Sequence, residues 1–189
     1  MSEELIIKHC SPTLAGIKTG SLFSLKLTPD TDLVGEVREL NKLLHKKGLR
    51  VVPLKKTSKY ALIYMYRPDH LKKDLNDPHA LSILRKRGYE PEDPDSCIVH
   101  LEGRLKSGDA FPHEIGLFLG YPPSDVECFM KHPCKGVKFC GYWKAYSKPD
   151  EARKTFLRFR MCTRAYHEMN RNGKTLAQLA VTTCTDPQD

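Results

Sequence analysis

Residues 50–67, RVVPLKKTSKYALIYMYR, decide the fold class of this chain. The two arms, 50–55 and 59–67, are rich in Val, Ile and Tyr, which favour extended backbone. The few polar residues between the arms are typical of a hairpin connection. This stretch therefore predicts two paired antiparallel strands.

The segment before the hairpin, residues 31–47, predicts a helix. Its apolar residues recur at the spacing of one helical face, at Leu33, Val37, Leu40 and Leu44. Asp30 or Thr31 is suited to cap the start, and Gly48 is suited to end the helix. A helix leading into a β-hairpin is the local unit around which we arrange the remaining predictions.

Further helices are predicted along the rest of the chain. The segments are 70–75, 78–87, 96–106, a helix beginning at Phe111, a short helix from Ser124, a long helix over 150–172, and 176–181. Residues 5–20 are expected to form a helix or loop leading into a strand over 21–27, and the aromatic segment 137–146 is expected to be strand-like. We predict an α+β fold, a single helix-rich domain over 1–185 with a small, mainly antiparallel sheet and a frayed tail at 186–189.

The composition is that of a globular protein. Of the 189 residues, 40% are hydrophobic and 29% are charged, which disfavours disorder. The longest apolar run, residues 60–66, is far shorter than the roughly 20 residues that cross a bilayer. The acidic start, Met1–Glu4, does not resemble a secretory signal. We therefore predict no membrane span and a cytoplasmic location.

The net charge and the number of cysteines narrow the possible classes of function. The chain carries 31 Lys and Arg against 23 Asp and Glu, a formal net charge of +8 that attracts anionic partners. Its 7 cysteines are an odd number without the spacing of a disulfide scaffold, so reduced thiols are expected. No glycine-rich phosphate loop pattern occurs, which disfavours the common nucleotide-dependent chemistries.

Three tracts resemble those of a bacterial family catalogued as domain of unknown function 3793. They are HCSPTLAGIK at 9–18, FPHEIGLFLGYP at 111–122 and GYWKAY at 141–146. The spacing of the tracts is also similar to that family, so the resemblance extends over nearly the whole chain. It implies no activity, cofactor or site residue.

The leading hypothesis for function is a thiol-dependent enzyme or redox protein. Cys10 would be the nucleophile, His113 its base, Glu114 the group that orients His113, and Lys18 an electrostatic helper. A thiol needs an imidazole or a positive charge nearby to become a thiolate at neutral pH. The alternative that these are ordinary buried or locally bonded residues stays open. The pocket would be walled by His9, Tyr121, Tyr142 and Trp143, and its helix start at Pro112 would favour a small anionic ligand.

Two other classes of function remain open. A non-catalytic protein could bind a transition metal or haem through His9, Cys10 and His113, whereas the thiol hypothesis requires no cofactor. Cys128, Cys134 and Cys140 with His132 are a second group of candidate metal ligands, without an established zinc-site spacing. The third class is a basic nucleic-acid-binding adaptor, in which the long helix presents cations beside Tyr142 and Trp143.

Overall fold

The computed structural model of the chain describes residues 1–108 and 110–183. They form two compact units. Of the described residues, unit 1 combines Met1–His70 with 162–183, and unit 2 is Leu71–Met161. The α+β class predicted from the sequence, rich in helix and with a small antiparallel sheet, is confirmed. The prediction of one domain over 1–185 stays a prediction, and the tail at 186–189 lies outside the described residues.

Unit 1 is built on a three-stranded antiparallel sheet with the strand order β1-β3-β2. The central strand β3 pairs Tyr66 with Gly20 of β1 on one side and with Arg50 of β2 on the other. The hairpin predicted from residues 50–67 is therefore confirmed. The elements of this unit are α1 (Glu3–Leu14), β1 (Gly20–Lys26), α2 (Leu33–Leu44), the 3-10 helix η1 (His45–Lys47), β2 (Arg50–Lys56), β3 (Tyr60–Tyr66), the start of α3 (Pro68–Leu75) and α9 (Leu176–Leu179).

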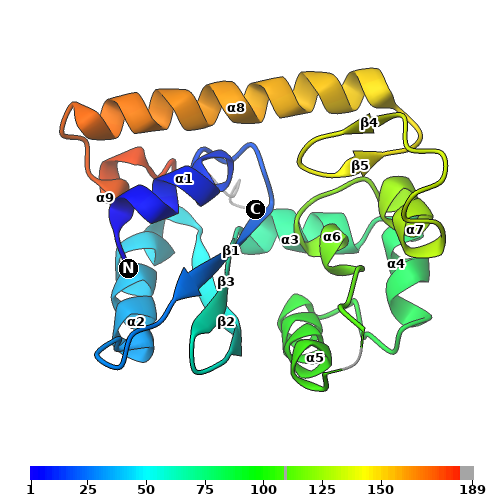
Figure 1. The fold of residues 1–189 in the computed structure, drawn as a ribbon, viewed down its shortest axis with the longest axis horizontal. Coiled ribbons are helices and arrows are strands. Elements are labelled where there is room, and N and C mark those ends of the chain that lie inside the picture. The colour runs from blue at the N-terminus through cyan, green and yellow to red at the C-terminus, as the bar shows by residue number, and fades with distance from the viewer. Residues whose placement is uncertain (109, 184–189) are drawn as a thin grey trace, which may run out of the picture. The chain divides into compact units, whose positions relative to one another are not determined.

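Helices α1 and α2 pack against this sheet, α1 on β1 and α2 on β2 (Figure 1). The cap of α2 differs from the prediction, because Asp32, and not Asp30 or Thr31, accepts the hydrogen bond from the Gly35 N–H at 3.0 Å. Gly48 ends this region in the left-handed conformation, with φ of 71°, as its sequence position suggested. The core of the unit gathers apolar residues from α1, α2, α9 and the three strands, among them Ile6, Leu44, Ile63 and Leu179.

A fully buried arginine, Arg67, fastens the end of α1 in unit 1. Its guanidinium donates to the carbonyl oxygens of Thr13 and Leu14 at 2.7 Å each, where α1 leaves carbonyls without helical partners. It also donates to Lys47 and Val181 carbonyls and to the Thr183 hydroxyl. All five N–H groups of the side chain are therefore used, which makes Arg67 a structural residue.

Unit 2 contains short helices, a small hairpin and the first half of a long helix. Its elements are the rest of α3, α4 (Pro78–Arg85), α5 (Pro94–Lys106), α6 (Ile115–Phe118), α7 (Pro123–Lys131), β4 (Phe139–Cys140), β5 (Lys144–Ala145) and α8 (Pro149–Arg171), which continues into unit 1. Helix α7 packs against α4, α6 and β5. A cluster of Ala145, Ala152 and Phe156, joined by Phe139 and Trp143, holds the hairpin on α8.

Two predictions in unit 2 are wrong in extent. The helix expected to begin at Phe111 is limited to Ile115–Phe118, because residues 112–114 form turns in which the Pro112 carbonyl accepts from the Ile115 N–H. The strand-like segment 137–146 contains only two paired residues on each side, β4 and β5. The long helix, by contrast, begins at Pro149 and ends at Arg171, close to its predicted bounds.

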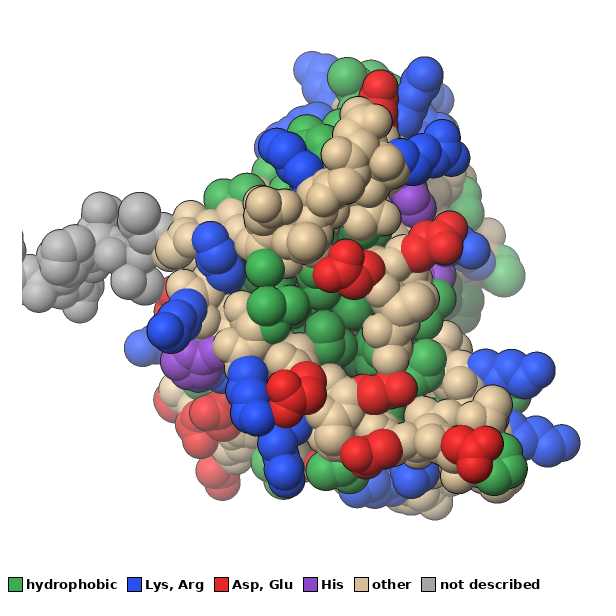
Figure 2. All heavy atoms as spheres, turned by 90° about the vertical axis from the view of Figure 1, so that its left-hand side faces the viewer, with side chains coloured by type: hydrophobic (Ala, Val, Ile, Leu, Met, Phe, Trp, Pro, Cys, Tyr) green, Lys and Arg blue, Asp and Glu red, His purple; other side chains and the backbone are tan. Residues whose placement is uncertain are grey.

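The charges of one face of the molecule are mixed. Figure 2 shows hydrophobic side chains near the middle of that face, with Lys and Arg side chains interspersed among Asp and Glu. No helix of the described residues is both long enough and apolar enough to cross a membrane.

Candidate functional site

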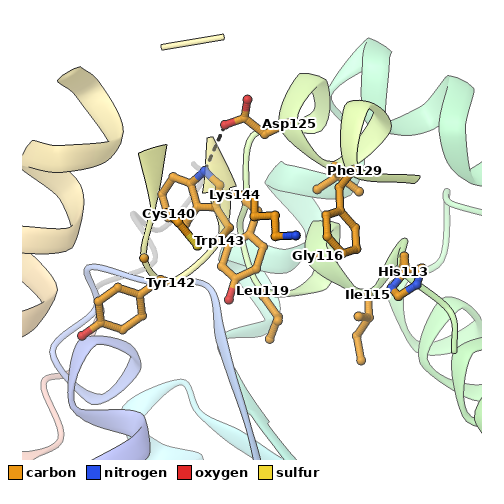
Figure 3. Close-up of a pocket in the computed structure, with 13 residues that line it drawn as sticks. His113, Ile115, Gly116, Leu119, Asp125, Phe129, Cys140, Tyr142, Trp143 and Lys144 are labelled. Carbon is orange, nitrogen blue, oxygen red and sulfur yellow. Dashed lines mark hydrogen bonds between the residues drawn. The ribbon is translucent and has the colours of Figure 1, made fainter. Parts of the chain in front are cut away.

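A pocket of about 330 Å³ lies in unit 2. One wall comes from α6, α7 and the turns beside them, and the other comes from the β4–β5 hairpin (Figure 3). Two of the three tracts that carry the family resemblance, 111–122 and 141–146, therefore meet at one cavity. The lining residues are His113, Ile115, Gly116, Leu119, Tyr121, Asp125, Val126, Phe129, Cys140, Gly141, Tyr142, Trp143 and Lys144.

Glycine at position 116 allows the first wall to close. A Cβ atom placed on Gly116 would lie 2.8 Å from a methyl carbon of Val126 and 3.3 Å from the Tyr121 ring. The Tyr121 N–H donates to the Gly116 carbonyl at 3.0 Å, so the chain folds back tightly after α6. The absence of a side chain at 116 thus brings α6 close to α7 and directs Tyr121 toward the pocket.

The second wall is held by a buried carboxylate, Asp125, in the first turn of α7. Asp125 accepts from the indole N–H of Trp143 at 2.9 Å and from the backbone N–H of Tyr146 at 2.9 Å. It also accepts from the backbone and the hydroxyl of Ser147, at 3.1 Å each. These four bonds attach the hairpin to α7 and fix the orientation of the Trp143 ring.

Aromatic rings surround Trp143 on the pocket side and on the α8 side. Its ring centroid lies 5.0 Å from that of Tyr121 and 4.4 Å from that of Phe156, the latter edge-on. Tyr142, from the same hairpin, contacts Phe156 and Phe159 of α8 at 5.6 and 5.1 Å. The hairpin wall is therefore a rigid aromatic surface, since each ring is supported by another.

Lys144 brings the positive charge into the pocket. The Lys144 side chain extends toward Phe129, with Nζ 5.4 Å from the ring centroid, and it donates to the Pro133 carbonyl at 2.8 Å (Figure 3). His113 lies at the rim, exposed, with its ring edge-on to Phe129 at 4.9 Å between centroids. Asp125 is the acidic residue of the lining, and its oxygens are already occupied by donors from the hairpin.

Glu114 does not orient His113, as the sequence-based hypothesis required. Its fully buried carboxylate forms an ion pair with Arg104 at 2.7 Å and accepts from the Tyr89 hydroxyl at 3.0 Å, and Arg87 lies 3.7 Å away. Burial, together with the adjacent Glu114 charge, raises the pKa of Tyr89. The physical reason is that consecutive side chains diverge by about 100° around a helical turn. Glu114 therefore faces the interior while His113 faces the pocket.

Cys10 is a core residue of unit 1. The thiol is completely buried, and burial raises its pKa to about 12, although Lys18 and a hydrogen bond with Ser21 act in the opposite direction. Burial also lowers the pKa of Lys18 to about 8, and the Lys18 ammonium donates to the Gly20 carbonyl. A reactive cysteine needs an accessible thiolate at neutral pH. These surroundings do not provide one, so the hypothesis of Cys10 as nucleophile loses its physical basis.

The predicted site residues are divided between the two units. His9, Cys10 and Lys18 belong to unit 1, where the exposed His9 stacks on Phe23 at 5.5 Å and burial lowers its pKa. Of the predicted residues in unit 2, the pocket brings together His113, Tyr121, Tyr142 and Trp143, and Cys140 of the second group of candidate ligands also lines it. Sequence reasoning missed Phe129, Lys144 and Asp125. Lys144 lies inside the GYWKAY tract, which was the one available signal for it.

Candidate metal ligands do not converge in the part of the chain that the structure describes. Within 1–108 and 110–183, no group of three His, Cys, Asp or Glu side chains is arranged to hold a metal ion. Cys128, Cys134 and Cys140 are exposed free thiols, and Cys184 lies outside the described residues.

Comparison with known proteins gives a family without an activity. Searches of curated proteins and of solved structures found no match. The profile of one family, described as protein of unknown function DUF3793, matches residues 6–180, which is nearly the whole chain. The chain therefore belongs to the DUF3793 family, as its three tracts had suggested.

Proposed function

We propose that this protein binds a small, planar, acidic molecule in the pocket of unit 2, as a non-catalytic binding protein. The observation that carries the proposal is the composition of the cavity, whose walls are aromatic and aliphatic and whose cation is the ammonium of Lys144, while the Asp125 carboxylate is engaged by the hairpin. Ligand pockets are typically apolar cavities with a few polar groups that fix orientation.

Ring geometry supports a planar ligand. Tyr121 and Phe129 belong to the wall of α6 and α7, and Trp143, from the hairpin wall, lies against Tyr121. A flat ring system can contact several of these aromatic surfaces, gaining dispersion and burial of apolar area. An aliphatic ligand of the same volume would make fewer face-on contacts.

Charge supports an acidic group on the ligand. Lys144 is close to Phe129 and His113 is at the rim, so an anion at the mouth would have an ammonium and an imidazole beside it. Asp125 adds little repulsion, because its carboxylate accepts four hydrogen bonds from the hairpin. A neutral ligand would leave the ammonium partly desolvated without a counter-charge.

Size favours one or two fused rings over a tetrapyrrole. About 330 Å³ lies at the lower end of the 300–1,000 Å³ range of small-molecule sites. The haem alternative named His9, Cys10 and His113 as ligands, and of these His113 lines the pocket, at its rim. The thiol-enzyme alternative depended on Cys10, which is buried and protonated. Planar-ligand binding is therefore the function that the pocket supports best.

The single tryptophan of the chain makes the proposal directly testable. Because Trp143 lines the pocket, its fluorescence reports occupancy without a label. We expect saturable quenching by 2-naphthoate, weaker quenching by uncharged 2-naphthol, and no effect of cyclohexanecarboxylate at matched concentrations. Absence of saturable quenching by any planar acid would contradict the proposal.

A pair of lysine variants supplies the matched control. Lys144→Met removes the ammonium in the pocket, whereas Lys148→Met removes an exposed one that pairs with Glu151 outside it. Naphthoate affinity should fall about tenfold in the first variant, the loss of roughly one charge-assisted contact, and stay unchanged in the second. Equal losses of naphthoate affinity in the two variants would show that the net charge of the protein, and not a contact with Lys144, attracts the ligand.

A further inference from the structure

Charge is distributed unevenly along the sequence of unit 2. Residues 71–127 contain seven Lys and Arg and eleven Asp and Glu, a net charge of −4. Residues 128–161 contain nine Lys and Arg and two Asp and Glu, a net charge of +7. The second segment comprises the end of α7, the β4–β5 hairpin and the unit 2 part of α8.

Several of these cations are exposed and carry no counter-charge. Lys138, Lys154, Arg158 and Arg160 are exposed, and no ion pair of theirs occurs among residues 1–108 and 110–183. Arg153 is exposed as well, and Arg153 and Arg160 are seven residues, about two turns, apart and therefore lie on the same side of α8, the side on which Arg153 lies over the Phe139 ring of the hairpin. A set of unpaired cations of this density repels itself, and a polyanion would relieve that repulsion.

The basic segment and the pocket share the same hairpin. Arg153 of α8 lies over the Phe139 ring of β4 at 4.8 Å, and Trp143 and Tyr142 contact Phe156 of α8. On the other side, Trp143 and Lys144 line the pocket. An extended anionic ligand with flat rings could thus place a ring in the pocket and its charges along the hairpin and α8.

We infer that the ligand of this pocket is a base of single-stranded nucleic acid, with the strand's phosphates bound by the hairpin and α8. This inference rests on the proposed function and names its ligand class. Proteins that bind single strands combine a cationic track with aromatic side chains on which bases stack. An acidic peptide or an anionic lipid surface would match the cations but would leave the aromatic pocket without a planar partner.

The experiment compares a strand with its monomer. Trp143 quenching is titrated with thymidine monophosphate and with an oligothymidylate of about 12 nucleotides, the span of one single-strand site. We expect both to quench Trp143 and the strand to bind at least about tenfold more tightly, with an affinity that falls steeply as salt is raised.

Paired variants locate the phosphate track. Arg153→Ala with Arg160→Ala should weaken strand binding about tenfold while leaving monophosphate binding unchanged, because each phosphate contact adds an electrostatic term. The control, Lys56→Ala with Lys59→Ala, removes the same charge from the end of β2 and the β2–β3 turn of unit 1 and should change neither affinity.

The outcomes separate this inference from the proposed function. Equal affinity for monophosphate and strand, with Trp143 quenched by both, would overturn the inference and leave the pocket function intact. Binding of the strand without quenching of Trp143 would also overturn the inference. So would an equal loss of strand affinity in the α8 double variant and in the unit 1 control. So would tighter binding to phosphatidylserine vesicles than to the strand, which would assign the cations and the exposed Leu157 and Met161 to a lipid surface.

Discussion

The indole of Trp143 and the carboxylate of Asp125 are joined by a hydrogen bond of 2.9 Å that links the β4–β5 hairpin to α7. The two residues lie 18 positions apart, and the same carboxylate receives two backbone N–H groups and a hydroxyl from residues 146 and 147. The pocket therefore depends on a buried acidic residue that need not contact the ligand.

Substitution of that acid should destabilise unit 2 and loosen the pocket. Asp125→Asn replaces one acceptor oxygen by an amide that competes with the hairpin donors, and we expect a loss of about 2 kcal/mol in the free energy of unfolding. Urea unfolding followed by circular dichroism measures this loss, and Trp143 emission should shift to longer wavelength. Asp150→Asn, at an exposed position in the first turn of α8, is the control and should change stability by less than about 0.5 kcal/mol.

Loss of the charge on Glu114 should also lower stability, without a change at the pocket. Glu114→Gln leaves Arg104 without its buried partner, and breaking a buried pair costs about 3–5 kcal/mol. Because Arg104 is about one third exposed, solvent screens part of that loss, and we expect about 2 kcal/mol. Naphthoate affinity should be retained in folded protein. A tenfold loss of naphthoate affinity would show that Glu114 contributes to ligand binding in the pocket.

Cysteine labelling should follow exposure. With limiting iodoacetamide at pH 7.5, we expect Cys128, Cys134 and Cys140 to be alkylated before Cys10, as read by peptide mass spectrometry. The reason is that Cys10 is fully buried with a pKa near 12, so both access and thiolate are lacking. Preferential alkylation of Cys10 in the native protein would revive the thiol-enzyme hypothesis.

The buried Lys18 predicts a rise in stability with pH. Its pKa is lowered from 10.5 to about 8 in the folded state, so above pH 8 the unfolded chain binds more protons at this site than the folded one. The contribution of Lys18 to the free energy of unfolding should therefore rise by about 1 kcal/mol from pH 7 to pH 9, a range that ends below the unfolded pKa.

The comparison that isolates this effect uses Lys18→Met. The methionine keeps the length of the side chain without the charge, so the variant should be more stable than the parent at pH 7, and the difference should narrow by pH 9. Urea midpoints at the two pH values measure it. A constant difference between the two proteins would show that Lys18 does not titrate in this range.

Local patterns predicted much of the fold. The helix expected over 31–47, the hairpin over 50–67 and the long helix near 150–172 all have signals within a few residues, such as apolar spacing and a proline at the start. The late start of α6 and the short strands of the hairpin were not predictable in this way, because those backbones are shaped by Asp125 and Gly116 contacts with other segments.

The site was predictable only in part for the same reason. Three aromatic residues of the pocket lie in distinctive sequence tracts. Tyr121, Tyr142 and Trp143 could therefore be predicted as pocket residues from those tracts alone. Burial is a long-range property, and nothing near Cys10 or Glu114 in the sequence indicates that both are fully enclosed. Arg67 is the extreme case, since its acceptors lie at positions 13, 14, 47, 181 and 183.

Those acceptors also have a consequence for the order of events during synthesis. The chain leaves the ribosome from its N-terminus, so Arg67 emerges more than a hundred residues before Val181, whose carbonyl it needs. The residues of unit 2 are contiguous and can fold while translation continues, as domains commonly do. Unit 1, by contrast, lacks two of the acceptors of Arg67 until Val181 and Thr183 have been synthesised. Its assembly is therefore a late event, completed only after the last turn, α9, has been released.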